Sequence, residues 1–319
     1  MASLRVTVAI ITYNRCRFLR QTLSGMVRQD FPGDRWELLV IDNNSTDDTP
    51  DVVTSFVTAN PSPRRIVETR QGLDFGRNRA IEEAKGDLIV LVDDDILVEP
   101  DWLTQLIAPF SSESAHKIGV VGGEVVPVFP DGIPQWLEGA HKPLGFRPDP
   151  GPLPPEQAPV GANFAFPKWV FTRFGMFDTR LDRRGSRLFG GGDSQMIRRL
   201  RTVGLEAWFV PGAGVKHQIS AERLTLGYAL RHAFDSARSR VADRVRTLRE
   251  SDASPAGFLA SRAAAGAVRA VGFLLFAAVC MLALRPGAAR RALVRAWRNC
   301  GYMYQIARTA FGEGRSSQA

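Results

Sequence analysis

The sequence predicts an α/β fold: a doubly wound, mostly parallel sheet followed by a C-terminal helical segment. Three observations lead to this prediction. Apolar runs rich in β-branched residues alternate with helical patterns over residues 1–220, as in a parallel sheet with crossover helices. Two of these runs end directly before aspartates, which suits the carboxyl edge of such a sheet, where ligands bind. Residues 221–319 instead mix arginines with apolar residues at helical spacing.

Four apolar segments in the first part of the chain are predicted strands: Val6–Thr12, Trp36–Ile41, Ile66–Glu68 and Asp87–Val92. The first is apolar and β-branched along its length, as a strand buried on both faces should be. Helices are predicted between the strands at Arg17–Gln29, from Thr49 as N-cap with Pro50 as the first helical residue, and at Gly76–Ala84. Asp42 and Asp95 then fall just beyond strand ends, at the ligand-binding edge.

The following stretch is less regular. Pro143–Pro159 contains seven prolines, which predict an extended surface loop, either a plain connection or a loop that covers substrate. After it we expect a strand at Val160–Phe166, a helix at Asp193–Val203, a short strand at Ala207–Val210 and a loop that reaches His217.

The charge is divided unevenly and suggests two domains, 1–220 and 221–319. The second carries 16 arginines against 6 acidic residues, whereas the first carries 25 basic and 27 acidic residues. The hydrophobic fraction of 45% and the charged fraction of 23% are ordinary for a folded chain and indicate neither disorder nor a polytopic membrane protein. Three widely spaced cysteines, and an N-terminus without a secretory signal pattern, predict a cytoplasmic protein.

Asp93, Asp94 and Asp95 crowd three carboxylates at the end of a predicted strand. Such a cluster repels itself unless it shares a cation, so an oxygen-binding ion such as Mg²⁺ or Mn²⁺ is the predicted cofactor. An ion here could bridge a diphosphate and neutralise a departing nucleoside diphosphate. A solvated acidic loop or a helix cap is the alternative.

Several motifs resemble those of the family 2 glycosyltransferases in order and spacing. They are VTVAIITYNR, VIDNNSTDDT, GLDFGRNRAIEEAKGDLIVLVDDD, GANFAFPKWVFTRFGMFDTRL and FGGGDSQMIRRLRTVGLEAWFVPGAGVKH, which together cover Val6 to His217. The resemblance implies a GT-A type domain that binds a nucleoside-diphosphate sugar as donor. By position, Asp42 resembles the carboxylate that recognises the nucleoside, and Thr12 and Asn14 lie in the first-strand loop of the same pocket.

Arg77 and Asn78 match the family's A-R-N motif, in which a helix N-terminus packs near the nucleotide, although Gly76 stands where alanine is frequent. Asp93 and Asp95 resemble the D-x-D pair. The resemblance implies that Asp95 is the direct metal ligand, and that Asp93, nearer the ribose or the metal, is assisted by Asp94.

His217, in a V-P-x-x-x-V-x-H context, resembles the family's histidine metal ligand. Asp193 occupies the second position of the E-D motif, where the carboxylate is the general base; its alternative is a helix cap. Gly192 replaces the usual glutamate and leaves the acceptor type open. The implied reaction is a single displacement with inversion, in which Asp193 takes the proton of the acceptor hydroxyl.

The C-terminal segment predicts association with a membrane. Ala270–Leu284 contains no charged residue. Arginines flank this segment on both sides, which favours a helical hairpin or an in-plane anchor on the cytoplasmic face over a spanning helix. Arg223–Arg249 and Ala288–Arg308 have the pattern of interfacial helices. Packing of a helical domain on the catalytic core is the alternative. No nucleic-acid motif accompanies the arginines, so no nucleic-acid partner is expected.

Rival functions remain at this level. A nucleotidyltransferase also binds nucleotides on a doubly wound sheet, but it should carry a glycine-rich loop after the first strand, and TYNRCRFLR has no glycine. A non-catalytic scaffold would not need Asp42, Asp93, Asp95, Asp193 and His217 together. Transfer to a polyprenyl phosphate is the alternative to a glycan or lipid-linked acceptor with a hydroxyl nucleophile. The sequence does not identify the sugar, the base or the acceptor.

Overall fold

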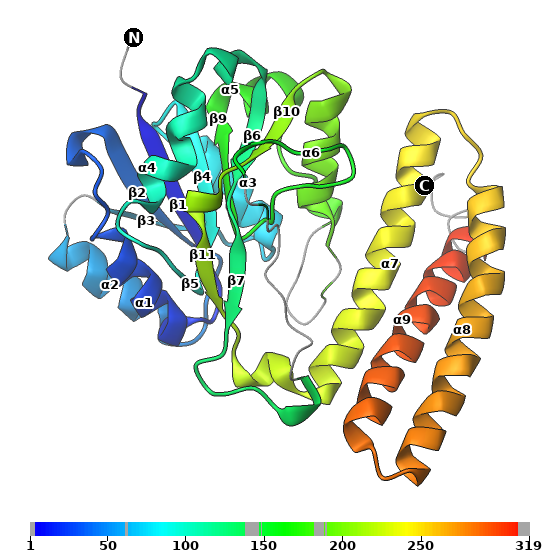
Figure 1. Cartoon of the computed structure of the whole chain (residues 1–319). Helices are drawn as coiled ribbons and strands as arrows, with labels where there is room; N and C mark the ends of the chain where they lie inside the picture. The colour runs from blue at the N-terminus through cyan, green and yellow to red at the C-terminus, as the bar shows by residue number, and fades with distance from the viewer. Residues whose placement is uncertain are drawn as a thin grey trace. The chain divides into compact units, whose positions relative to one another are not determined.

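An eight-stranded sheet with the order β3-β2-β1-β4-β9-β6-β10-β8 forms the centre of the first part of the protein (Figure 1). Its strands are β1 (Val6–Thr12), β2 (Trp36–Asp42), β3 (Arg64–Val67), β4 (Leu88–Asp93), β6 (Ile118–Gly122), β8 (Gly151–Pro152), β9 (Asn163–Pro167) and β10 (Glu206–Phe209). The first four strands in this order are mutually parallel, and β6 is parallel to β10. β9 runs antiparallel to both β4 and β6. The predicted α/β class with a mostly parallel sheet is confirmed.

The computed structural model describes residues 4–60, 63–137, 147, 149–181, 188 and 190–311. Two compact units make up the chain. The first consists of Met1–Pro130, Lys142–Asp182 and Gly192–Ile219, and the second of Asp131–His141, Arg183–Gly191 and Ser220–Ala319.

Helices cover both faces of the large sheet because successive side chains of a strand point to opposite faces. On β1, Val8 and Ile10 face α1 (Cys16–Met26), α2 (Thr49–Ala59) and α4 (Trp102–Ile107). Ala9 and Ile11 face α3 (Leu73–Glu83), α5 (Lys168–Phe174) and α6 (Gly192–Thr202). Short 3-10 turns complete the described elements: η1 (Gly33–Arg35), η2 (Ala108–Ser111), η3 (Glu113–Lys117), η4 (Gln135–Leu137), η5 (Thr179–Leu181), η6 (Pro211–Ala213) and η7 (Ala221–Leu224).

A second, three-stranded sheet has the order β5-β11-β7, with β5 (Ile96–Leu97), β7 (Val125–Val128) and β11 (Val215–Gln218). β11 pairs antiparallel with β5 and parallel with β7. The sequence predicted a loop up to His217, which is wrong: His217 lies within β11, opposite Ile96.

Element boundaries differ from the prediction in three instructive places. Thr49 is not the N-cap of α2 but its first residue, and its hydroxyl oxygen accepts a hydrogen bond from the backbone N of Arg15 (3.0 Å). α3 begins at Leu73, ahead of the predicted Gly76. Pro152 lies in a strand, because β8 is an edge strand in which a missing N–H donor is tolerated. Residues 143–146 and 148 of the proline-rich segment lie outside the described residues.

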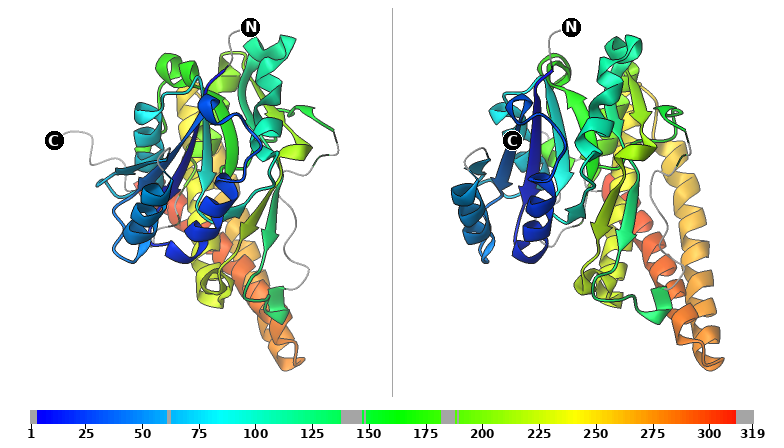
Figure 2. Two further views of the ribbon diagram at one scale, coloured as in Figure 1. Left: turned by 90° about the vertical axis from the view of Figure 1, so that its left-hand side faces the viewer. Right: turned by 60° about the vertical axis from the view of Figure 1, so that its left-hand side comes forward.

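Three long helices dominate the second unit: α7 (Leu226–Glu250), α8 (Ala256–Leu282) and α9 (Pro286–Phe311). α9 packs on both α7 and α8, and Figures 1 and 2 show α8 and α9 side by side. Gly301 permits the close approach of α9 to α7, since a Cβ at that position would lie 2.3 Å from the carbonyl oxygen of Phe234. The predicted C-terminal helical segment is therefore confirmed.

Two short segments from earlier in the chain also belong to this unit. The carbonyl oxygen of Trp136 accepts a hydrogen bond from Arg291 of α9 (2.8 Å). The backbone N of Leu188 donates to Asp235 (3.1 Å), and that of Gly190 donates to Ser239 (2.9 Å), both on α7.

α8 is the one helix, among the residues that the structure describes, that is long and apolar enough to cross a membrane, judged by length and composition. Only 22% of its most apolar window is buried within the protein. Large apolar side chains are correspondingly exposed along it, including Val268, Leu275, Val279 and Leu282.

Candidate functional site

The register of the large sheet brings three predicted site residues to one edge. Thr12 pairs with Asp42 across β1 and β2, and Ile11 pairs with Asp93 across β1 and β4. Because these strands are parallel, Thr12, Asp42 and Asp93 all lie at carboxyl ends, where a doubly wound sheet binds its ligands.

Asp42 is buried, and both of its carboxylate oxygens have partners. Oδ1 accepts a hydrogen bond from the backbone N of Ser45 (3.0 Å), and Oδ2 accepts one from Arg65 (2.9 Å). Asn14, in the left-handed region with φ 52°, exchanges hydrogen bonds with Thr46: its Oδ1 accepts from the Thr46 N (2.8 Å), and its Nδ2 donates to Oγ1 (3.3 Å). These bonds join the loops after β1 and β2 into one wall, and each Asp42 oxygen retains a lone pair for a ligand.

Pairing between β5 and β11 brings His217 to the aspartate cluster. The backbone N of Gln218 donates to the Asp95 carbonyl (2.8 Å). His217 Nε2 then lies 2.8 Å from Asp95 Oδ1 and 4.0 Å from Asp93 Oδ2. One donor atom from each of the three residues falls within 4.8 Å of the others.

This donor set fits a divalent cation. Adjacent ligands on an octahedral ion with bonds of about 2.1 Å are about 3 Å apart, close to the His217–Asp95 separation. Two carboxylates and an imidazole can together bind a divalent transition-metal cation such as Mn²⁺. Asp95 is almost fully buried, so the attraction between its charge and a cation would be weakly screened.

Asp94 shows the electrostatic strain in the cluster. Its burial, and next the negative charge of Asp95, raise the pKa of Asp94 to about 7, while the positive charge of Arg15 opposes the rise. Arg15 Nη1 lies 3.5 Å from Asp95 Oδ2. The Thr22 hydroxyl of α1 lies 2.9 Å from the Asp94 carbonyl oxygen, which helps to hold the turn. A cation at the cluster would favour the ionised form of all three carboxylates.

Asp193 is held by a buried arginine. Arg77 Nη1 lies 2.5 Å from Asp193 Oδ1 and 2.9 Å from Asp74 Oδ1. The guanidinium carbon of Arg77 lies 5.4 Å from the ring centre of Phe164 and 5.2 Å from that of Phe177. Burial opposes the charge of Arg77, but attraction to Asp193, Asp74 and Asp93 outweighs it and raises the pKa of Arg77. Asp193 itself keeps a third of its side chain exposed and can therefore meet a substrate.

Two glycines make room for this arrangement. A Cβ at Gly161 would lie 1.9 Å from Asp193 Oδ2, and one at Gly192 would lie 2.3 Å from Asp74 Oδ2. Any side chain at position 192 would thus start where the Asp74 carboxylate lies. Gly192 replaces the family's glutamate, and the structure puts the carboxylate of Asp74, from α3, against it.

One short segment lies between the Asp193 group and the candidate metal-ligand group. The carbonyl oxygen of Ala162 accepts a hydrogen bond from the backbone N of Asp93 (3.4 Å), and that of the preceding Gly161 accepts one from Arg77 (3.4 Å). Gly161–Ala162 therefore separates Asp193 from the Asp93 end of the cluster.

The side chains of the A-R-N motif are engaged within the protein. Arg77 bonds the two carboxylates, and Asn78 exchanges hydrogen bonds with the backbone of Phe177 at 2.9 and 3.0 Å. Direct contact of either residue with a donor stays a prediction. A Cβ at Gly76 would lie 2.6 Å from Ile11 Cγ2, so an alanine there would require the Ile11 side chain to shift.

Sequence reasoning missed three residues of this site: Arg15, Asp74 and Gly161. Arg15 and Gly161 lie within the quoted motifs TYNR and GANFAF but were given no role. Asp74 precedes Arg77 by one helical turn, a spacing at which an Asp–Arg pair can be expected. Glycine at position 192, where the family has glutamate, was the one feature of the sequence to suggest that another residue supplies this carboxylate.

Comparison with known proteins supports the family resemblance that the sequence motifs suggested. The profile of glycosyl transferase family 2 matches residues 7–172, more than half of the chain. Glycosyltransferase AglE of Haloferax volcanii is 30% identical over 128 residues, 40% of this chain and 41% of that protein. Glucosyl-dolichyl phosphate glucuronosyltransferase of the same organism is 23% identical over 241 residues, which cover 72% of this chain and 74% of that protein.

Among solved structures, the mannosyltransferase PcManGT from Pyrobaculum calidifontis, in complex with GDP-Man and Mn²⁺, is similar in fold. It superposes with a TM-score of 0.62 at 21% sequence identity and covers 95% of this chain and 87% of that one. This similarity shows a GT-A type fold.

Proposed function

This chain belongs to glycosyl transferase family 2 and is a glycosyltransferase, and we propose that it moves a sugar from a nucleoside diphosphate to an acceptor hydroxyl with inversion. One observation carries the proposal: a donor set that fits a divalent cation lies one short segment away from a carboxylate held by a buried arginine. The first group suits a diphosphate leaving group and the second an attacking hydroxyl.

The donor would lie along the carboxyl edge of the sheet. Asp42, with Thr12 and Asn14 beside it, would bind the nucleoside through the free lone pairs of its carboxylate. Asp93, Asp95 and His217 would hold Mn²⁺ or Mg²⁺, with Asp94 behind them. When bound, the ion supplies positive charge that stabilises the leaving diphosphate. The Mn²⁺ and GDP-Man of the similar structure support this assignment.

Asp193 would act as the general base. Its Oδ1 is bonded to Arg77, which orients the side chain, and its exposed part can reach the acceptor. As the acceptor oxygen attacks C1 of the sugar, its proton passes to Asp193 and the C1–O bond to the diphosphate breaks. Asp74 would act as a positioning residue, because it shares the same Arg77 nitrogen and fills the space beside Gly192.

The acceptor class that we propose is a glycan or a lipid-linked saccharide at the cytoplasmic face of a membrane. One relative, which is similar over 72% of this chain, has a glucosyl-dolichyl phosphate in its name. The exposed apolar side chains of α8 would suit such a location. These features support a membrane-borne acceptor without identifying the sugar.

The test is release of nucleoside diphosphate from a panel of nucleotide sugars with Mn²⁺, Mg²⁺ or excess chelator. We expect turnover with one donor class, loss in chelator and recovery on adding Mn²⁺. Asp95→Asn and His217→Ala should each lose most of this recovery, since metal ligation is their proposed role.

A matched control is Asp51→Asn, an exposed aspartate of α2 outside the site, which should behave as the unaltered protein. Binding of Mn²⁺ measured by calorimetry separates loss of the ion from loss of chemistry. Full turnover in excess chelator would contradict the metal assignment, and no turnover with any nucleotide sugar would contradict the donor class.

A further inference from the structure

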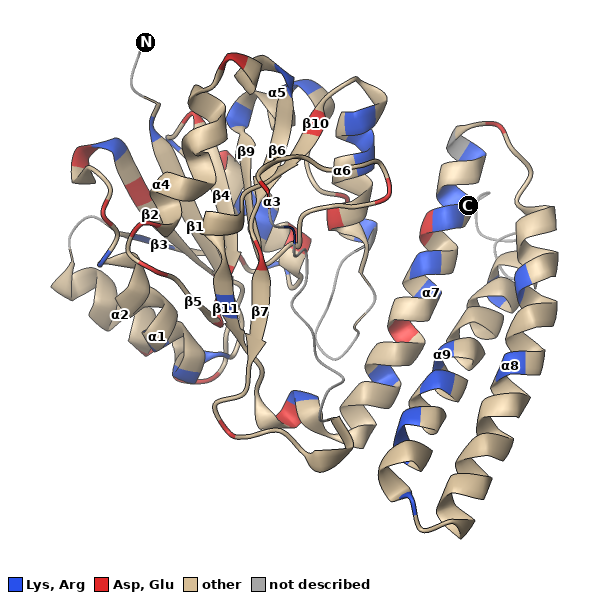
Figure 3. Cartoon of the chain, in the orientation of Figure 1, with Lys and Arg blue, Asp and Glu red and all other residues tan. Residues whose placement is uncertain are grey.

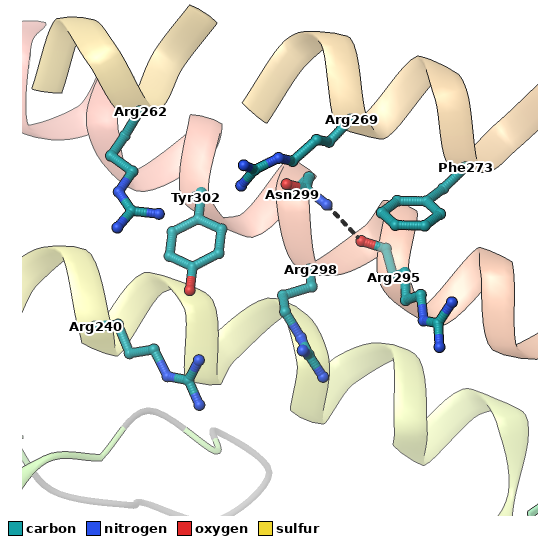
Figure 4. Close-up of a pocket in the computed structure, with 8 residues that line it drawn as sticks. All are labelled: Arg240, Arg262, Arg269, Phe273, Arg295, Arg298, Asn299 and Tyr302. Carbon is teal, nitrogen blue, oxygen red and sulfur yellow. Dashed lines mark hydrogen bonds between the residues drawn. The ribbon is translucent and has the colours of Figure 1, made fainter. Parts of the chain in front are cut away.

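The helical unit contains a cavity lined by five arginines (Figure 4). Arg240 projects from α7, Arg262 and Arg269 from α8, and Arg295 and Arg298 from α9. Phe273, Asn299 and Tyr302 complete the lining of this cavity, whose volume is about 410 Å³. We call it the arginine pocket. Its size falls within the range of about 300–1,000 Å³ that is typical of small-molecule sites.

The five arginines of the pocket are exposed to solvent, and no acidic side chain is among the residues that line it. Among the described residues, none of the five guanidinium groups takes part in an ion pair. Figure 3 shows basic residues on all three helices and few acidic ones. Like charges gathered in one place repel one another, even when solvent screens them, and an anion shared between them would reduce that repulsion.

The geometry favours phosphate as the anion. Each guanidinium presents a planar fork of N–H donors that matches two oxygens of a phosphoryl group, and three helices supply such forks from different sides. The only side chains of other kinds in the lining are two aromatic rings and a buried amide that donates to the Arg295 carbonyl (2.8 Å). The pocket thus combines charged donors with apolar walls.

We propose that the arginine pocket binds the phosphate headgroup of an anionic membrane lipid. The helix that supplies Arg262, Arg269 and Phe273 also carries the exposed apolar side chains Leu275, Val279 and Leu282 farther along its length. A phosphate in the pocket and acyl chains along α8 would together satisfy both surfaces, as basic pockets between helices do for phosphorylated lipids. A free phosphate compound would satisfy only the charges. This proposal goes beyond sugar transfer and does not depend on it.

The experiment is flotation of the full-length protein with vesicles at constant ionic strength. One set contains phosphatidylcholine alone, a second adds phosphatidic acid, and a third adds phosphatidylserine to the same surface charge. The variant Arg269→Gln/Arg295→Gln/Arg298→Gln removes three pocket charges. Its matched control, Arg285→Gln/Arg290→Gln/Arg308→Gln, removes three charges that are likewise exposed and belong to the same unit but lie outside the pocket.

We expect preferential binding to phosphatidic acid, whose phosphomonoester is accessible, and a loss of at least about tenfold in the pocket variant but not in its control. Equal losses of vesicle binding in the two variants, or equal binding to the two anionic lipids, would show that general surface charge explains the binding. Either result would overturn the proposal. The single variant Arg298→Lys keeps the charge but loses the fork, and should be intermediate.

Two further arms identify the source of the phosphate. Calorimetric titration with inorganic pyrophosphate, without vesicles, should give much weaker binding than phosphatidic acid vesicles give. Pyrophosphate binding of comparable strength that the pocket variant abolishes would assign the pocket to a soluble phosphate compound and overturn the lipid assignment. Single-stranded RNA that loses binding in the pocket variant, while vesicle binding persists, would overturn it in favour of nucleic acid.

Discussion

Asp193 presents its two carboxylate oxygens to different surroundings. Oδ1 is bonded to Arg77, and Oδ2 lies in the space that the missing side chain of Gly161 leaves. The bond to Arg77 restricts the Asp193 side chain to one orientation. We therefore expect Asp193 to contribute more to the rate of transfer than to the binding of the substrates.

Asp193→Asn keeps the size of the side chain and removes the base. If the acceptor nucleophile is a hydroxyl, we expect kcat to fall by at least about 10², with donor and metal affinities nearly unchanged. Steady-state transfer and donor titration measure the two quantities separately. Transfer close to normal would remove the base assignment and favour an already ionised acceptor, such as a polyprenyl phosphate.

The contact between Asp74 and Gly192 predicts that substitutions at these two positions have non-additive effects. Gly192→Glu should strongly reduce transfer, because its Cβ would lie 2.3 Å from Asp74 Oδ2, and Asp74→Ala should do so by freeing Arg77. In Asp74→Ala/Gly192→Glu a carboxylate returns to the vacated space. The double variant should therefore recover activity relative to both single variants, a strongly non-additive result. Fold-losses in kcat that simply multiply, and thus add as free energies, would show that the two positions act independently.

Long apolar strands were the elements most readily predicted. β1, β2 and β4 follow the predicted segments within one residue, because burial on both faces requires a continuous apolar run. The sheet β5-β11-β7 was missed, since two- to four-residue strands containing Pro127 and Lys216 carry no clear pattern. The antiparallel direction of β9 was not predictable either, because strand direction depends on pairing partners far along the chain.

Those features of the site that depend on pairing between distant parts of the chain could not be predicted either. Asp42 and the Asp93–Asp95 cluster could be placed from the strand ends on which they lie. The proximity of His217 to Asp95 depends on the β5–β11 pairing, and only the family resemblance suggested it. The Asp74 carboxylate beside Gly192 joins two helices from different parts of the chain, so no local pattern could reveal it.

The apolar surface of α8 should give binding to membranes that salt does not reverse. Replacing Leu275, Val279 and Leu282 by serine removes large exposed side chains without disturbing a buried core. We expect the unaltered protein to remain on vesicles through a high-salt wash and the variant to be released, with binding at least about tenfold weaker. Val27→Ser/Val203→Ser, at exposed positions of the first unit, is the control and should behave as the unaltered protein. Release of the unaltered protein by salt alone would exclude apolar insertion.

Helix α7 is connected to the site through the chain itself. The bond between the Gly190 N and Ser239 lies two residues before Gly192, where α6 begins with Asp193 as its second residue. Within the helical unit, this hydrogen bond thus anchors the segment from which the chain continues into α6.

Ser239→Ala removes this anchor without altering any residue of the proposed site. A single hydrogen bond contributes about 0.5–1.5 kcal/mol, so transfer should fall by roughly twofold to tenfold if the anchor positions Asp193. Ser236→Ala is the matched control, since the only hydrogen bond of its hydroxyl among the described residues is one of 3.5 Å to the Ala233 carbonyl within α7. Equal kcat values for the two variants would show that the anchor has no effect on transfer.

The alternation of the chain between its two units has a consequence for protein engineering. The polypeptide passes from one unit to the other five times, and Trp136 and Leu188 bond helices that come much later in the chain. The helical unit is therefore not a cassette that a single crossover can exchange. A chimera that receives residues 220–311 alone would leave the donor's α9 and α7 without their native counterparts to Trp136 and Leu188, whereas one that also carries 131–141 and 183–191 would keep the whole unit together.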